Sequence, residues 1–246
     1  AENLPEIWKA RFCRMHFFNP PRYLPLVELI PNHKTDQNLL DQIESFLVRY
    51  LGKKVIQAKD TPNFIANRLG IFSLMITMHY TKIFQIPLEI VDELTGKLLG
   101  RPKSATYRTA DIVGLDVIGH VLETSKKGLP NCVFKALYDL PEWVNDLVKS
   151  GALGQKTGKG FYQKKSEGLF VYDLDLKNYR LKDKKADPEV LKIFENKNWG
   201  ERFKNLASSD HPQAKFLWAI FRELLIYAAR SAEKIEASQD QIDTAL

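Results

Sequence analysis

RFCRMHFFNPPRYLPLVELI, residues 11–30, contains the strongest strand signals of the chain. It contains two runs of mostly aliphatic and aromatic residues, 11–18 and 23–30, separated by Asn19-Pro20-Pro21-Arg22. A pair of prolines cannot continue a strand, because proline lacks the backbone N–H that a sheet ladder needs. The stretch therefore predicts two strands joined by a bend.

The residues after this stretch predict a helix and a third strand. Thr35 and Asp36 cap a helical pattern that runs to about Leu51, where Gly52 ends it. Residues 55–58 then predict a short buried strand. This order of β, β, α, β is typical of the trailing half of a doubly wound sheet, yet the chain contains no Gly-x-Gly-x-x-Gly turn. We therefore expect the nucleotide-binding half of such a sheet to be missing.

Most of the chain beyond Asp60 has the spacing of apolar residues that is typical of helices. Helices are predicted at 63–84, from Pro87 onward, at 110–124 and at 141–150, and short strands at 161–162 and 169–172. One pattern occurs twice, imperfectly: Ile71-Phe72 followed by Ile90-Val91-Asp92, and Ile220-Phe221 followed by Gln241-Ile242-Asp243. This repeat indicates a duplicated helical module. The sequence therefore predicts a mixed α/β, mainly α fold.

Composition argues against several classes of protein. The formal net charge of +6 suits an anionic partner, but the 36 basic residues are interspersed with 30 acidic ones and accompany no nucleic-acid-binding module. Two cysteines are too few for a disulfide framework and fit a reducing compartment, so we expect a cytoplasmic location. No apolar run reaches the length of a membrane span. We expect neither a nucleic-acid partner nor a membrane span.

His16 and Glu28 are the first candidates for chemistry. His16 ends a strand just before the proline bend, where side chains emerge into a cleft beside a sheet, and Glu28 lies among apolar residues of the adjacent strand. Burying an unpaired carboxylate is costly, and pairing with His16 would remove that cost while holding the imidazole in one tautomer as a general base. The alternative is that Glu28 is exposed and pairs with nothing.

Asn67, near the start of the long helix, is the third candidate. Its amide either bonds to the backbone or holds an oxygen of a substrate, and the sequence leaves both roles open. No metal site is expected, because the other histidines have no cysteine or carboxylate at metal-ligand spacing: His33, His79, His120 and His211.

Three motifs in a fixed order carry a resemblance to a known family. They are His16-Phe17-Phe18-Asn19-Pro20 with Leu26-Val27-Glu28, then DTPNFIANR (60–68) and KTGKGFY (156–162). With these motifs the chain resembles the L-3-hydroxyacyl-CoA dehydrogenases, and closely the long bacterial type with two copies of the helical C-terminal module. The resemblance implies the end of a truncated NAD-binding Rossmann domain at 1–59, a helical dehydrogenase C-terminal domain at 60–165, and a connector with a truncated second repeat at 166–246.

The resemblance also implies a role for each candidate residue. His16 would take the proton of the substrate's 3-hydroxyl while hydride passes to NAD, Glu28 would orient His16, and Asn67 would position the substrate oxygen. Asn19 and Lys156 match positions that contact the cofactor. The substrate would be an acyl-CoA of fatty-acid β-oxidation, and the helical domain would form a homo-oligomer such as a dimer.

Two departures from the family pattern matter. Asn63 replaces the glycine that follows proline in the second motif, and asparagine tolerates the left-handed backbone that such a turn needs. The Rossmann half, with the substrate-contacting serine that precedes the histidine motif, is absent, so we expect a fragment that is inactive alone. The alternatives are a non-catalytic helical dimerisation module and an acyl-CoA-binding module.

Overall fold

The structure, a computed structural model, describes residues 4–18, 21–61, 63–129, 134–235 and 238–245. The chain forms two compact units. The first unit comprises Ala1–Ile71 and Leu225–Leu246, and the second comprises Phe72–Leu224. The two boundaries fall within helices α3 (Ala66–Phe84) and α10 (Pro212–Ile235).

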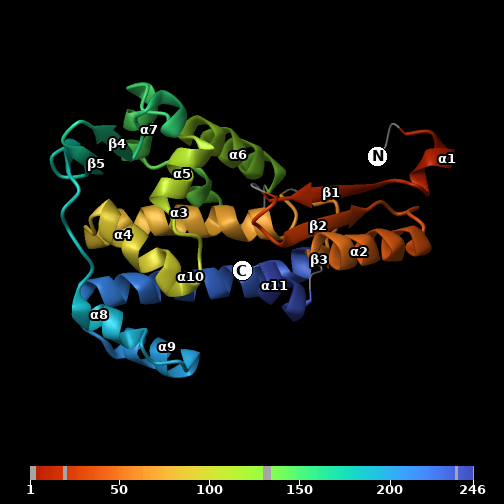
Figure 1. The fold of residues 1–246 in the computed structure, drawn as a ribbon. Helices are drawn as coiled ribbons and strands as arrows, with labels where there is room; N and C mark the ends of the chain where they lie inside the picture. The colour runs from red at the N-terminus through yellow and green to blue at the C-terminus, as the bar shows by residue number, and fades with distance from the viewer. Residues whose placement is uncertain (1–3, 19–20, 62, 130–133, 236–237, 246) are drawn as a thin grey trace. The chain divides into compact units, whose positions relative to one another are not determined.

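A three-stranded sheet forms the centre of the first unit (Figure 1). Strand β2 (Leu26–Pro31) lies between β1 (Cys13–Phe17), to which it is antiparallel, and β3 (Lys54–Gln57), to which it is parallel. Helix α2 (Gln37–Leu51) makes the crossover between the parallel strands. The predicted order β, β, α, β is therefore confirmed. The unit also contains the short helices α1 (Glu6–Lys9) and α11 (Gln239–Ala245).

Local sequence signals set the two ends of α2. The Asp36 carboxylate accepts a hydrogen bond from the backbone N–H of Asn38 at 2.8 Å, and Gly52 ends the helix with a left-handed φ of 62°. The neighbouring strand β2 is buried on both of its faces, since the consecutive residues Val27, Glu28 and Leu29 are all 0% exposed. A carboxylate thus lies in the middle of the apolar core of this unit.

Helix α3 begins later than the sequence predicts. The expected start at residue 63 is wrong, because Asn63 and Phe64 have positive φ angles of 62° and 50° and form a turn before the helix, which starts at Ala66. The expectation that Asn63 adopts a left-handed backbone in place of glycine is confirmed. The turn makes Ile65 and Ala66 the residues whose backbone N–H groups head the helix.

The second unit is mainly helical and carries a small antiparallel sheet (Figure 1). Its strands lie in the order β4 (Tyr162–Lys165), β5 (Gly168–Asp173) and β6 (Asn178–Leu181), of which β6 was not predicted. The prediction of one helix at 110–124 is wrong, because Gly114, with a φ of 100°, separates α5 from α6. The helices that lie wholly within this unit are α4 (Leu88–Thr95), η1 (Lys97–Leu99), α5 (Tyr107–Val113), α6 (Leu115–Gly128), η2 (Lys135–Tyr138), α7 (Glu142–Lys149), η3 (Gln155–Thr157), α8 (Pro188–Ile193) and α9 (Trp199–Ser208).

Two buried carboxylates join separate segments of the second unit. Asp92 accepts hydrogen bonds from the backbone N–H of Tyr107 at 2.6 Å and from the hydroxyl of Tyr162 at 2.8 Å. Asp111 accepts from the backbone N–H groups of Phe161 at 2.7 Å and Tyr162 at 2.8 Å. Burial raises the pKa of each carboxyl group to about 6, although these hydrogen bonds oppose the rise. Asp92 and Asp111 therefore connect α4 and α5 to the segment that leads into β4.

The duplicated pattern of the sequence lies in α3 and α4 and again in α10 and α11. The aspartates of the two copies differ in their surroundings, since Asp92 is buried and Asp243 is exposed. The aspartate of the first copy therefore holds other parts of its unit together. The three-part division at 1–59, 60–165 and 166–246 stays a prediction.

Candidate active site

The antiparallel pairing of β1 and β2 brings His16 and Glu28 together. The two residues lie directly opposite each other in the strand register, and Nδ1 of His16 is 2.8 Å from Oε2 of Glu28. Glu28 is fully buried, so it does not occupy the exposed, unpaired position that was the alternative. Because an ionised carboxylate only accepts hydrogen bonds, this contact places the ring proton of a neutral His16 on Nδ1.

The second oxygen of Glu28 binds the start of helix α3. Oε1 accepts hydrogen bonds from the backbone N–H groups of Ile65 at 2.8 Å and Ala66 at 2.7 Å. A carboxylate at a helix N-terminus is stabilised by the unpaired N–H groups and by the helix dipole. Charge-assisted hydrogen bonds of this kind contribute about 1.5–3 kcal/mol each, which offsets the cost of burying the charge. Glu28 therefore anchors both His16 and the helix that carries Asn67.

The other ring nitrogen of His16 faces Asn67. Nε2 lies 3.4 Å from Nδ2 of Asn67, and the His16 side chain is 29% exposed. The rings of Phe18 and Phe64 lie against the imidazole, with centroids 4.6 Å and 5.7 Å away. With the proton on Nδ1, Nε2 keeps its lone pair and can accept a proton, while the amide beside it can donate to an oxygen. The cluster therefore has the parts of a general base and an oxygen-holding group at one accessible point.

The structure unites three of the five predicted site residues. His16, Glu28 and Asn67 form one cluster in the first unit. Lys156 belongs to the second unit, where it lies in η3 and forms an ion pair with Asp116 at 2.6 Å. Asn19 lies outside the described residues.

The crossover from β2 to β3 does not fit the pyrophosphate of a dinucleotide. Such a group needs a glycine-rich turn and free N–H groups at the helix start. Here residues 32–36 contain no glycine, and the Asp36 carboxylate already accepts the N–H of Asn38. A phosphate at this point would meet a like charge.

Within the described ranges, no group of three or more His, Cys, Asp or Glu residues could hold a metal ion, and no helix has the length and apolar character to cross a membrane.

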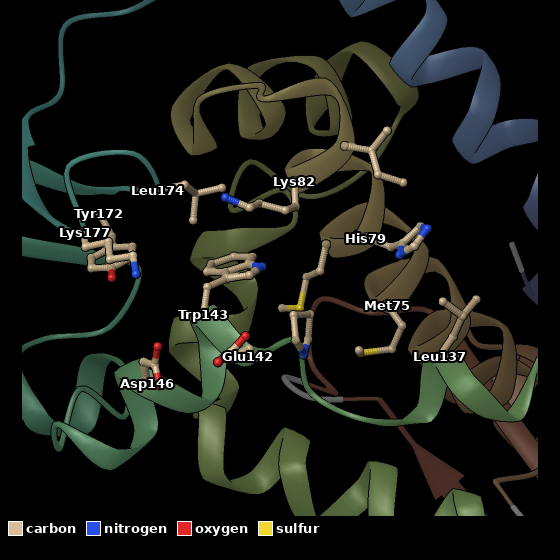
Figure 2. A pocket seen from close by; sticks show the side chains of 13 residues that line it. Met75, His79, Lys82, Leu137, Glu142, Trp143, Asp146, Tyr172, Leu174 and Lys177 are labelled. Atoms are coloured by element: carbon tan, nitrogen blue, oxygen red, sulfur yellow. The ribbon is translucent and has the colours of Figure 1, made fainter.

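A pocket in the second unit was not predicted from the sequence. It has a volume of about 460 Å³, and Figure 2 shows Lys82 and Trp143 projecting into the space that its lining encloses. One wall comes from α3, where Met75, Met78, His79 and Lys82 follow the spacing of one helix face. That spacing was the available signal, but the same pattern fits an ordinary core face. Charged side chains from α7 and from the turn after β5 also line the pocket: Glu142, Asp146 and Lys177.

Family models and curated proteins point to the same family for this chain. Residues 7–61 match the 3-hydroxyacyl-CoA dehydrogenase NAD binding domain, and residues 64–164 match the C-terminal domain of the same family. A probable 3-hydroxyacyl-CoA dehydrogenase of Bacillus subtilis is 38% identical over 100% of this chain and 31% of its own length. A putative fatty acid oxidation complex trifunctional enzyme of Rickettsia prowazekii is 30% identical over 99% of this chain and 33% of its own. The chain thus spans about a third of the length of these relatives.

Solved structures show a similar fold. FadB2 of M. tuberculosis is similar with a TM-score of 0.55 and 30% identity, over 63% of this chain and 53% of that one. A 3-hydroxybutyryl-CoA dehydrogenase of Escherichia coli K12 shares the fold over 96% of this chain and 60% of its own, with a TM-score of 0.63 and 20% identity. From the two domain matches, the curated relatives and the fold, we conclude that the chain belongs to the 3-hydroxyacyl-CoA dehydrogenase family.

Proposed function

We propose that this chain is part of an NAD-dependent dehydrogenase of the long bacterial type, which oxidises L-3-hydroxyacyl-CoA to 3-ketoacyl-CoA in fatty-acid β-oxidation. The observation that carries the proposal is the contact of His16 Nδ1 with the buried Glu28, which leaves Nε2 accessible beside Asn67. The names of the relatives support the same substrate class, because they refer to 3-hydroxyacyl-CoA and to fatty acid oxidation.

Proton removal is the step that residues of this chain perform. Nε2 of His16 accepts the proton of the substrate's 3-hydroxyl, and the resulting imidazolium is stabilised by the Glu28 carboxylate at 2.8 Å. Asn67, attached to the helix that Glu28 anchors, holds the substrate oxygen as it becomes a carbonyl. NAD, when bound, supplies the acceptor for the hydride that leaves C3.

We assign most of the dinucleotide site to residues outside this chain. The crossover after β2 lacks a turn that fits pyrophosphate, and the relatives are about three times as long. Asn19 and Lys156 are proposed to contact the cofactor in the longer protein. Lys156 must then give up its ion pair with Asp116 and bind the cofactor instead. The same proposal includes domain boundaries at 59/60 and 165/166. It also includes a homo-oligomer formed through the helical domain.

The test is NADH formation from an L-3-hydroxyacyl-CoA, measured on two proteins. One is this 246-residue chain. The other is the proposed full-length protein, a chain of the relatives' length that contains these residues. Activity only in the longer protein is the expected result. Activity in neither, with short and long acyl chains, would favour a dimerisation or acyl-CoA-binding module instead.

A further inference from the structure

A second pocket of the second unit is lined by positive charges. Its volume is about 560 Å³, and it lies between α5 with the loop before it and the segments around β4. Lys103 and Arg108 come from the first side, and Lys164 comes from β4. Three cations from separate parts of the chain thus converge on one space.

Positive charges outnumber negative ones in the described lining of this pocket. Among the described residues, none of Lys103, Arg108 and Lys164 forms a salt bridge, whereas Lys156 pairs with Asp116 at 2.6 Å. Asp111 is the only carboxylate of the described lining; its two oxygens accept backbone N–H groups at 2.7 and 2.8 Å, and the charge of Arg108 acts to lower its pKa. Like charges brought together repel, so an anion between them is stabilised.

The rest of the lining identifies the kind of anion. The hydroxyl of Ser104 and the amide of Gln155 add neutral hydrogen-bond donors. Ile112, which is 62% exposed, and Leu169 offer apolar surface beside the cations. A phosphate suits the donors, and a flat heterocycle suits the apolar surface. We propose that this pocket binds a phosphate monoester carried by a nucleoside.

This inference rests on the charges of the second unit and does not require His16 to be catalytic. Two sources can supply the ligand: the 3′-phosphate of coenzyme A and the phosphate of a free nucleotide. Coenzyme A and dephospho-coenzyme A separate them, because only the former has the 3′-monoester. Tighter binding of coenzyme A identifies the first source. Binding of 5′-AMP, with no difference between the two coenzymes, identifies the second.

The experiment is calorimetric titration of the 246-residue chain at low and at physiological salt. The probes are 3′-AMP, 5′-AMP, the two coenzymes and adenosine. At least one monoester is expected to bind and adenosine is not. The variants Lys103→Gln, Arg108→Gln and Lys164→Gln should each weaken binding about tenfold, as expected when one charge-assisted hydrogen bond is lost.

Matched controls remove the same charge elsewhere in the second unit. Lys149 on α7 and Lys192 on α8 are exposed and form no salt bridge with the described residues, so Lys149→Gln and Lys192→Gln should change affinity less than twofold. Thermal unfolding checks that every variant folds. Failure of all monoesters to bind, or equal losses in the pocket and control variants, overturns the proposal.

Discussion

Replacing Glu28 with glutamine is expected to preserve the fold and to remove the proton-accepting nitrogen of His16. The amide oxygen of glutamine can accept the N–H groups of Ile65 and Ala66 that Oε1 accepts now. Its NH₂ group then faces Nδ1 of His16, where the carboxylate lies at 2.8 Å in the wild type. The imidazole must accept at Nδ1 and carry its proton on Nε2, which is the opposite of the tautomer that a base needs.

The two effects of Glu28→Gln differ in size. Losing a negative charge at a helix N-terminus lowers the free energy of unfolding by about 0.3–2 kcal/mol. Glu28→Ala is more damaging, because each buried N–H group left unsatisfied costs about 1–3 kcal/mol and there are two of them. Loss of general-base catalysis lowers turnover by roughly 10²–10⁴-fold. Glutamine therefore separates the chemical role of Glu28 from its structural role.

Three measurements check the effect of Glu28→Gln. Nitrogen-15 NMR of the imidazole in this chain reports the tautomer, urea denaturation reports stability, and NADH formation by the proposed full-length protein reports turnover. Glu44→Gln is the control, since Glu44 accepts a hydrogen bond from Gln57 at 3.1 Å and takes no part in the His16 cluster. A ring that stays protonated on Nδ1 in Glu28→Gln, or turnover equal to wild type, would show that Glu28 does not set the tautomer of His16 for catalysis.

Two other predictions concern stability. Burial raises the pKa of Asp92 from 3.8 to about 6, so the native state binds more protons than the unfolded state between these values and stability rises as pH falls through this window. Between pH 7 and pH 4, urea denaturation should show the free energy of unfolding of wild type rising by roughly 1–3 kcal/mol relative to that of Asp92→Asn. If the difference between the two proteins does not change with pH, burial does not raise the pKa of Asp92. Asn63 has a φ of 62°, so Asn63→Val should lower the free energy of unfolding by about 1–2 kcal/mol more than Asn63→Gly. Equal losses in these two variants would show that backbone conformation does not limit this position.

Much of the first unit follows from short-range signals in the sequence. The two prolines in the sequence after His16 predict two separate strands, and Asp36 caps α2 and Gly52 ends it; each signal involves only a few adjacent residues. The antiparallel arrangement then pairs His16 with Glu28, as expected for strands joined by a bend. This part of the site was predictable because it depends on strand pairing alone.

Features that depend on tertiary contacts were not predictable from the sequence. No local pattern indicates that Glu28 caps α3, since the hydrogen bonds to Ile65 and Ala66 link residues 37 and 38 positions apart. The same holds for the convergence of Lys103, Arg108 and Lys164. The break at Gly114 had a signal, the glycine itself, but apolar periodicity continues on both sides of it.

The role of His16 as the catalytic base is tested by the turnover of the His16→Gln variant of the proposed full-length protein. NADH formation should fall by roughly 10²–10⁴-fold, because no other group of the described cluster can take the proton of the 3-hydroxyl. His33→Gln, which changes an exposed histidine, should leave turnover unchanged, and neither variant should alter the oligomeric state. Turnover of His16→Gln equal to wild type would contradict the assignment of His16 as the catalytic base.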